Sequence, residues 1–283
     1  MLYLFLAIIA TFTNSVLIKL NETRGANTNI VIAGNYISAG IIGWMLTFYN
    51  GYTGVSLPTL ILGLLGGFLW PGGFYLLMIG IRQYGISLTG AMCRLSLIIP
   101  VIFALFFLNE RISMNMGLGL SAAFFAFYCF NPRGFMSIKG VDKRAAWFFP
   151  VLILWFGIVD LWVNLFNQFG RDNEKFLFVT LIFTSSNVLA WVYVRLKHIS
   201  VDGHSLVQGL ILGVPNIFST YFMLECLKSA AFMNNSARAY TIYAIMGVTL
   251  AFVAGPLFWK ERVTKLNFCG LIAAVFAITL LNG

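Results

Sequence analysis

One stretch of this chain occurs twice, as an internal sequence repeat. Residues 110–127 recur 151 residues later as residues 261–278, and eight of the eighteen positions are identical. Each copy opens with a Glu-Arg pair and continues into an apolar run, with Ser113 or Thr264 placed to cap the helix that follows. An internal repeat constrains a fold more strongly than a single motif does. The sequence therefore predicts one structural unit built in two copies.

The composition indicates that the chain lies in a lipid bilayer. Of its 283 residues, 60% are hydrophobic and 10% are charged, and the mean hydropathy is +0.88. Soluble domains carry about 25% charged residues, so this chain cannot cover a water-facing surface. The net charge is +9. Nucleic-acid binding would require a basic face on a soluble domain, and the sequence offers none. The four cysteines form no C-x-x-C pair, so neither a disulfide framework nor a zinc site is expected.

Ten apolar runs are long enough to cross the hydrocarbon core, which takes about 20 residues. Backbone amides in lipid must bond within their own segment, so each run is predicted to be a helix and the fold to be all-α. The predicted spans are 2–20, 29–49, 57–81, 85–108, 113–130, 146–169, 174–195, 204–227, 235–258 and 264–282.

The longest connection, residues 131–145, divides the ten predicted helices into five and five. The predicted repeats are residues 1–135 and 136–283. Five is an odd number, so the second copy enters the membrane in the opposite sense. This inverted repeat is typical of secondary transporters that alternate access around a site at mid-membrane depth.

A second similarity between the copies is a pair of glycines one helical turn apart, followed by a proline. The residues are Gly63, Gly67 and Pro71 in the third span, and Gly209, Gly213 and Pro215 in the eighth. Small residues at this spacing let helices approach closely, while glycine and proline also permit a bend. Close packing and a moving hinge both fit the pattern, and the two roles are compatible.

Lysine and arginine are distributed unevenly between the two predicted membrane faces. Loops after odd-numbered spans hold twelve of the eighteen, and the opposite loops hold four. Basic loops tend to stay cytoplasmic, so this distribution predicts external termini.

Three ionisable side chains within the predicted spans are the main functional candidates, because a charge in hydrocarbon is costly. They are Arg94, Asp160 and Arg238. Two arginines facing one cavity would favour a carboxylate or phosphate, since the guanidinium group binds such groups with two hydrogen bonds. Asp160 could carry a coupling proton, because burial raises the pKa of a carboxyl group. A structural ion pair with one of the arginines is an equal alternative.

Other polar and aromatic residues could line the same substrate pathway. They are Asn14, Trp70, Tyr75, Tyr240 and Tyr243. Ordinary packing is the alternative for each aromatic residue. Asn14 and Asn35 are polar positions at depth, and an interhelical hydrogen bond is the default expectation for both. Glu225 and Lys228 are three residues apart on one helical face and are expected to pair locally.

The chain contains none of the common catalytic or nucleotide-binding motifs. It has no G-x-x-x-x-G-K-[ST], H-E-x-x-H or G-x-S-x-G sequence. An enzyme is therefore not expected, and neither is a metal or a cofactor. Uphill transport by such a chain would draw on an ion gradient or on exchange.

Ten helices in two copies, each with a Glu-Arg turn before its last helix, resemble the EamA-type transporters of the drug/metabolite transporter superfamily. The segments ALFFLNERISMNMGLGLSAA and GPLFWKERVTKLNFCGLIAA match best, and the resemblance covers nearly the whole chain. It implies a central cavity, alternating access, and small metabolites, amino acids or drugs as substrates. It also implies cytoplasmic termini, against the charge distribution. The superfamily's four-helix exporters carry a glutamate deep in the first helix, whereas here Asn14 stands at comparable depth.

The sequence therefore predicts a secondary transporter of small polar or zwitterionic metabolites, an exporter or exchanger. Its expected partners are a small-molecule substrate, the lipid bilayer and a coupling proton. The expected location is a bacterial cytoplasmic membrane, crossed several times. The alternatives are an exporter of cationic compounds, a non-transporting membrane scaffold, and a membrane enzyme acting on lipid-linked substrates.

Overall fold

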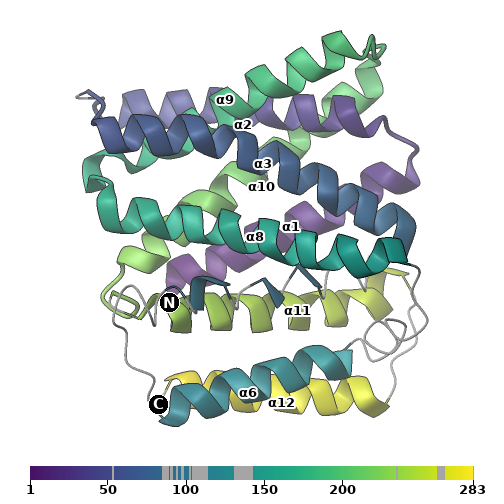
Figure 1. Ribbon diagram of the computed structural model, residues 1–283, viewed down its shortest axis with the longest axis vertical. Helices are drawn as coiled ribbons and strands as arrows, with labels where there is room; N and C mark the ends of the chain where they lie inside the picture. Colours follow the sequence, from purple (N-terminus) through teal and green to yellow (C-terminus); the bar gives the residue numbers. More distant parts are fainter. Residues whose placement is uncertain are drawn as a thin grey trace. The chain divides into compact units, whose positions relative to one another are not determined.

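The computed structural model consists of helices joined by turns and loops in the part of the chain that it describes (Figure 1). It describes residues 1–282 except 53, 85–88, 90–91, 94, 97–98, 102, 104–113, 131–142, 234 and 260–264. Within these residues there is no β-strand, as predicted. Six of the helices are long and apolar enough to cross a membrane, as a multi-pass membrane protein requires.

Nine of the ten predicted spans coincide with helices. These are α1 (Leu2–Thr23), α2 (Thr28–Tyr49), α3 (Leu57–Tyr84), α6 (Met114–Phe130), α8 (Lys143–Phe169), α9 (Lys175–Leu196), α10 (Gly203–Lys228), α11 (Ser236–Trp259) and α12 (Lys265–Asn282). A short 3₁₀ turn, η2 (Asp172–Glu174), precedes α9. The fourth predicted span, 85–108, lies largely outside the described residues.

The helices form two compact units that differ from the two halves of the sequence. Unit 1 comprises Met1–Tyr75 and Trp162–Ser229, and unit 2 comprises Leu76–Leu161 and Ala230–Gly283. Each unit therefore takes helices from both predicted repeats, and α3 and α8 each contribute to both units. The division of the sequence into repeats stays a prediction about ancestry and symmetry, separate from this division into units.

Helix α2 is the centre of unit 1. It packs extensively on α10 and on α9, and α1 also packs on α10 (Figure 1). The buried residues of α2 occupy successive turns on several sides of the helix, from Ile30 to Thr47. A helix that is apolar all round is suited to this enclosed position.

Glycines bring the backbones of α2 and α10 into contact. A Cβ atom on Gly209 would lie 2.9 Å from the Cα atom of Gly34 and 3.0 Å from the amide nitrogen of Asn35. One turn later, a Cβ atom on Gly213 would lie 3.0 Å from the amide nitrogen of Ala39. Only glycine fits at such distances from a neighbouring backbone. The two helices therefore run parallel, in contact over at least one turn.

Helices α3 and α9 approach each other through the other glycine pair. A Cβ atom on Gly63 would lie 2.5 Å from the Cβ atom of Leu181, and one on Gly67 would lie 3.0 Å from the carbonyl carbon of Ser185. The Ser186 hydroxyl donates to the Gly67 carbonyl at 3.3 Å. The structure thus places all four glycines predicted as packing or hinge residues at close helix contacts. Pro71 and Pro215 lie inside α3 and α10.

The first turns of α2 and α10 are capped and joined. The Asn27 side chain accepts from the Asn29 amide at 3.1 Å, and Asp202 accepts from the Ser205 amide at 2.7 Å. The Asn27 amide donates to the Ser205 hydroxyl at 2.8 Å and so links the two helix starts. The hydrogen bond from the Ser205 amide lowers the pKa of the exposed Asp202 carboxyl below its usual value.

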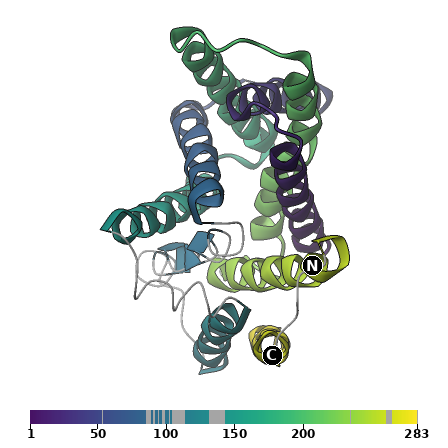
Figure 2. The same ribbon diagram turned by 90° about the vertical axis from the view of Figure 1, so that its right-hand side faces the viewer.

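Unit 2 is built around α6, α11 and α12. Helices α6 and α12 pack on each other most extensively, and α11 contacts both; Figures 1 and 2 show α6 beside α12. A separate apolar cluster of Met92, Phe149 and Leu152 buries the first half of α8. Gly157 continues this face, since a Cβ atom there would meet the Ile99 side chain. These contacts fix the part of α8 that carries Asp160.

Replacing Gly209 by alanine should destabilise the protein, because its methyl group would overlap the α2 backbone. Forcing one extra carbon into a packed contact costs about 1–3 kcal/mol. The matched control is Gly203→Ala in the same helix, where a Cβ atom meets nothing within 4 Å. Thermal unfolding in detergent should show a lower midpoint for Gly209→Ala only. Equal midpoints for the two variants would contradict the backbone contact.

Candidate functional site

Several predicted residues lie outside the described part of the chain. Arg94, the first arginine candidate, is among them. So are both Glu-Arg pairs of the repeated stretch, together with their predicted caps Ser113 and Thr264. The site is therefore built here from the candidates that the structure describes.

Asp160 and Tyr240 come together in unit 2. The Tyr240 hydroxyl donates to the Asp160 backbone carbonyl at 2.7 Å, and the tyrosine is almost fully buried. The hydroxyl oxygen of Ser96 lies 3.5 Å from Oδ2 of the Asp160 carboxylate and also donates to the Cys93 carbonyl. A carboxylate beside a hydroxyl within apolar helices can hold a proton or accept hydrogen bonds from a cationic or zwitterionic ligand.

Arg238 starts the same helix as Tyr240 but contacts different groups. Its guanidinium carbon lies 6.0 Å from the centre of the Phe232 ring, within cation–π range. Its backbone amide donates to the Asn235 side chain at 3.2 Å, which caps the first turn of α11. Tyr243 lies one turn further along α11 and is half-buried. The structure therefore gathers three of the predicted residues on α11, within one unit.

Neighbouring residues of α8 are anchored in different units. Asp160 is the hydrogen-bond acceptor for Tyr240 in unit 2, whereas the Trp162 indole donates to the Leu62 carbonyl of α3 in unit 1 at 2.8 Å. Asp160 thus lies within one turn of the position where α8 passes from one unit to the other.

The other predicted pathway residues belong to unit 1. Asn14 is buried in α1, and its side-chain oxygen has no hydrogen-bond partner among the described residues. Trp70 is buried in α3, whereas Tyr75 is 46% exposed and packs edge-on against Tyr193 at 6.4 Å. Trp70 and Tyr75 thus belong to one unit, and Tyr240 and Tyr243 to the other.

Asn35 forms the interhelical hydrogen bond expected of it. The Asn216 side-chain nitrogen donates to the Asn35 side-chain oxygen at 3.0 Å, and both residues are buried between α2 and α10. The amide pair lies beside the Gly209 and Gly213 contacts, so it fixes the register of the two helices. That prediction is confirmed.

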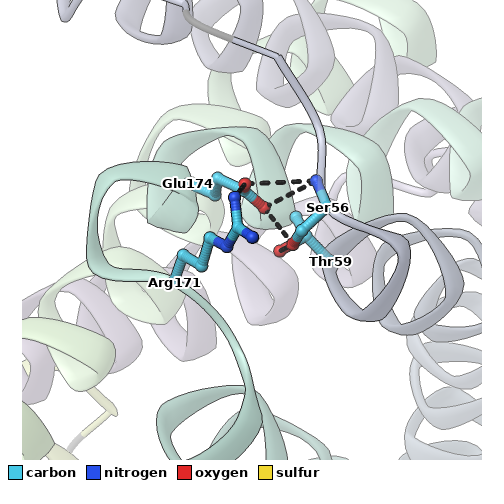
Figure 3. A network of polar contacts seen from close by, with 4 residues as sticks. All are labelled: Ser56, Thr59, Arg171 and Glu174. Atoms are coloured by element: carbon cyan, nitrogen blue, oxygen red, sulfur yellow. Dashed lines mark hydrogen bonds and ion pairs between the residues drawn. The ribbon is translucent and has the colours of Figure 1, made fainter.

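Figure 3 shows a second polar cluster, centred on Glu174. This carboxylate is only 4% exposed, and both of its oxygens accept from the Ser56 amide at 3.1 Å. The Ser56 hydroxyl donates to the same group at 2.5 Å, and Arg171 lies 3.8 Å away. A negative charge at the start of a helix is stabilised by the helix dipole. Glu174 therefore fixes the first turn of α3 to the start of α9.

The predicted local pair of Glu225 and Lys228 is wrong. Lys228 pairs with Asp172, and Glu225 pairs with Lys175. The end of α10 lies beside η2 and the start of α9. Asp172 and Lys175 there face the base and the acid of α10. Pairing across the helices satisfies all four charges and ties the two segments together, which a local pair would not do.

The sequence pattern does not single out Glu174. Its position as the first residue of a predicted span suggests only a solvated acid, because its partner Ser56 lies 118 residues away in sequence. The sequence does carry a signal at Ser56, the residue that Glu174 binds. Ser56 and Thr59 have the spacing of a helix N-terminus, and their hydroxyls are 3.0 Å apart. Within the described part of the chain, no cluster of three metal-binding side chains occurs.

Comparisons with known proteins identify relatives but no activity. The chain is 28% identical over 290 residues to a protein of Haemophilus influenzae described as uncharacterized, covering 97% of this chain and 95% of that one. A crystal structure with 14% sequence identity superposes with a TM-score of 0.70, covering 99% of this chain and 95% of the other. This likeness shows a shared fold. No model of a known protein family matches the chain.

The two ion pairs at the end of α10 should differ in energy, because the acid of one is largely enclosed and the acid of the other is exposed. Lys175→Met leaves Glu225, 12% exposed, without its partner, and should lower stability by about 3 kcal/mol. Lys228→Met is the matched control. Its partner Asp172 is 80% exposed, so the loss should stay near or below about 1 kcal/mol. Thermal unfolding of the two variants checks this, and equal losses would contradict it.

Proposed function

We propose that this chain is a secondary transporter of small polar or zwitterionic metabolites in a bacterial cytoplasmic membrane. In this proposal it belongs with the EamA-type members of the drug/metabolite transporter superfamily. Its ten membrane helices form two inverted five-helix repeats, residues 1–135 and 136–283, that alternate access to a central site. The single observation that carries the proposal is a set of matched contacts with a constant sequence offset.

The glycine contacts obey an offset of 146 residues on both sides. Gly209 meets Asn35 and Gly213 meets Ala39, while Gly63 meets Leu181 and Gly67 meets Ser185. Adding 146 to Gly63 and Gly67 gives Gly209 and Gly213. Adding 146 to their counterparts Asn35 and Ala39 gives Leu181 and Ser185. The caps follow the same rule, since Ser56 and Thr59 at the start of α3 correspond to Asp202 and Ser205 at the start of α10. Agreement at so many positions supports a repeat of the first three helices.

The relative direction of matched helices supports inversion. Helix α2 corresponds to α9 under this offset. Tyr36 packs on Phe183, whereas Thr47, further along α2, bonds to Thr180, earlier in α9. The two helices therefore run antiparallel, as equivalent helices do in an inverted repeat.

The polar groups at depth suit a substrate that carries charge. Asp160 lies in the middle of α8 with hydroxyls of Ser96 and Tyr240 close by. Under the 146-residue offset it corresponds to Asn14, the polar residue at depth in α1. A carboxylate in one repeat and an amide at the matching position of the other make Asp160 the ionisable member of this pair, and it can bind an ammonium group or carry a coupling proton.

The proposal predicts that a substrate stabilises the purified protein against heat. A ligand at a hundredfold excess over its dissociation constant adds about 2.7 kcal/mol to the free energy of unfolding. Amino acids, organic acids, nucleosides and cationic dyes are screened by thermal unfolding. We expect a shift with an amino acid or other zwitterion, and expect Asp160→Asn and Arg94→Ala to remove it.

The control variant is Ser121→Ala, which should keep the full shift. Ser121 is exposed, and its hydroxyl bonds only within its own helix, to the Gly117 carbonyl at 2.9 Å. A shift with cationic dyes alone would favour an exporter of cationic compounds. The absence of any shift, together with no uptake of the same compounds into proteoliposomes, would reject transport and favour a scaffold.

A further inference from the structure

The two ends of the unit 1 helices differ in how their charges are satisfied. One end contains the α1–α2 and α9–α10 turns, and the joined starts of α2 and α10 mark it. Figure 1 shows this end at the right. It carries four basic residues, Lys19, Arg24, Arg195 and Lys197, against two acids, Glu22 and Asp202. The other end, where α9 starts and α10 finishes, carries three bases and three acids.

All three bases at the α9 start are engaged in ion pairs. Arg171 pairs with Glu174, Lys175 with Glu225, and Lys228 with Asp172. At the opposite end, Arg24, Arg195 and Lys197 are exposed and form no ion pair with any described residue. Among the described residues of unit 1, positive charge without an ion-pair partner is therefore concentrated at one end.

Along the last turns of α9, the exposed side chains change from apolar to aromatic to basic. A bilayer changes in the same order, from hydrocarbon through the interface to the headgroups. Val188 and Val192 are exposed apolar residues. Tyr193 follows, 40% exposed and in ring contact with the exposed Tyr75 of α3. Exposed tyrosines are typical of the membrane–water interface. Lys197, which is exposed, lies one turn beyond Tyr193, where this order of side chains predicts the lipid headgroups.

We propose that this end of unit 1 binds the phosphate groups of anionic phospholipids. Lys197, Arg195 and Arg24 supply the positive charge. Tyr193, one turn before Lys197 and in ring contact with Tyr75, supplies an aromatic group at the interface. Basic residues next to a membrane helix attract the anionic lipids of the cytoplasmic leaflet. Lipid binding does not depend on transport being the function of the chain, so it can be tested without a substrate.

The experiment titrates short-chain phosphatidylglycerol into the detergent-solubilised protein and follows the thermal unfolding midpoint. Phosphatidylcholine is the neutral-lipid arm, and inorganic phosphate is the free-anion arm. We expect a saturable rise with phosphatidylglycerol alone. The triple variant Arg24→Gln, Arg195→Gln, Lys197→Gln should lose it, with each neutralised cation weakening the apparent affinity about fivefold.

Arg171→Gln is the matched control, because it removes one exposed cation from the opposite end, where it is paired. It should keep the wild-type response to phosphatidylglycerol. The proposal is overturned if the triple variant responds as the wild type does, or if phosphatidylcholine gives an equal rise. An equal rise with inorganic phosphate would also overturn it, because the surface would then be a general anion site.

Discussion

The close approach of two parallel helix pairs is the contact on which unit 1 depends. Gly34 and Gly209 allow the backbones of α2 and α10 to touch, and Gly63 and Gly67 do the same for α3 and α9. In hydrocarbon no hydrophobic force drives such pairs together, so they rely on dense packing and on polar contacts between helices. The Asn35–Asn216 bond and the Ser186 bond to Gly67 lie beside the glycines and add direction to this packing.

Charges near the helix ends extend the same arrangement. Glu174 caps α3 from the start of α9, and Lys175, adjacent in sequence, pairs with Glu225 on α10. These two adjacent residues thus hold α3, α9 and α10 together at one end of unit 1. Each charge is compensated, because an unpaired carboxylate or ammonium in such a setting costs several kcal/mol.

Hydropathy predicts the helices well because each span must satisfy its own backbone, which is a local requirement. Nine predicted spans agree with helices, and Asn35 forms its expected bond. Side-chain partners depend instead on which segments meet. Glu225 and Lys228 look like a local pair in sequence, yet each finds its partner across the bundle. Glu174 gives no local signal, because its partner Ser56 belongs to a distant helix. The grouping of α1, α2, α9 and α10 into one unit likewise depends on contacts that no single segment encodes.

Matched packing raises the question of what orients such a chain in a membrane. If α2 and α3 are related to α9 and α10 by inversion, the backbone contacts are nearly the same at both ends and cannot select a direction. The side chains at the ends are not matched. One end pairs Arg171, Lys175 and Lys228 with acids, and the other leaves Arg24, Arg195 and Lys197 unpaired. Under the lipid-binding proposal, orientation follows from this difference in charge, because the anionic cytoplasmic leaflet would attract the end whose cations have no ion-pair partner among the described residues.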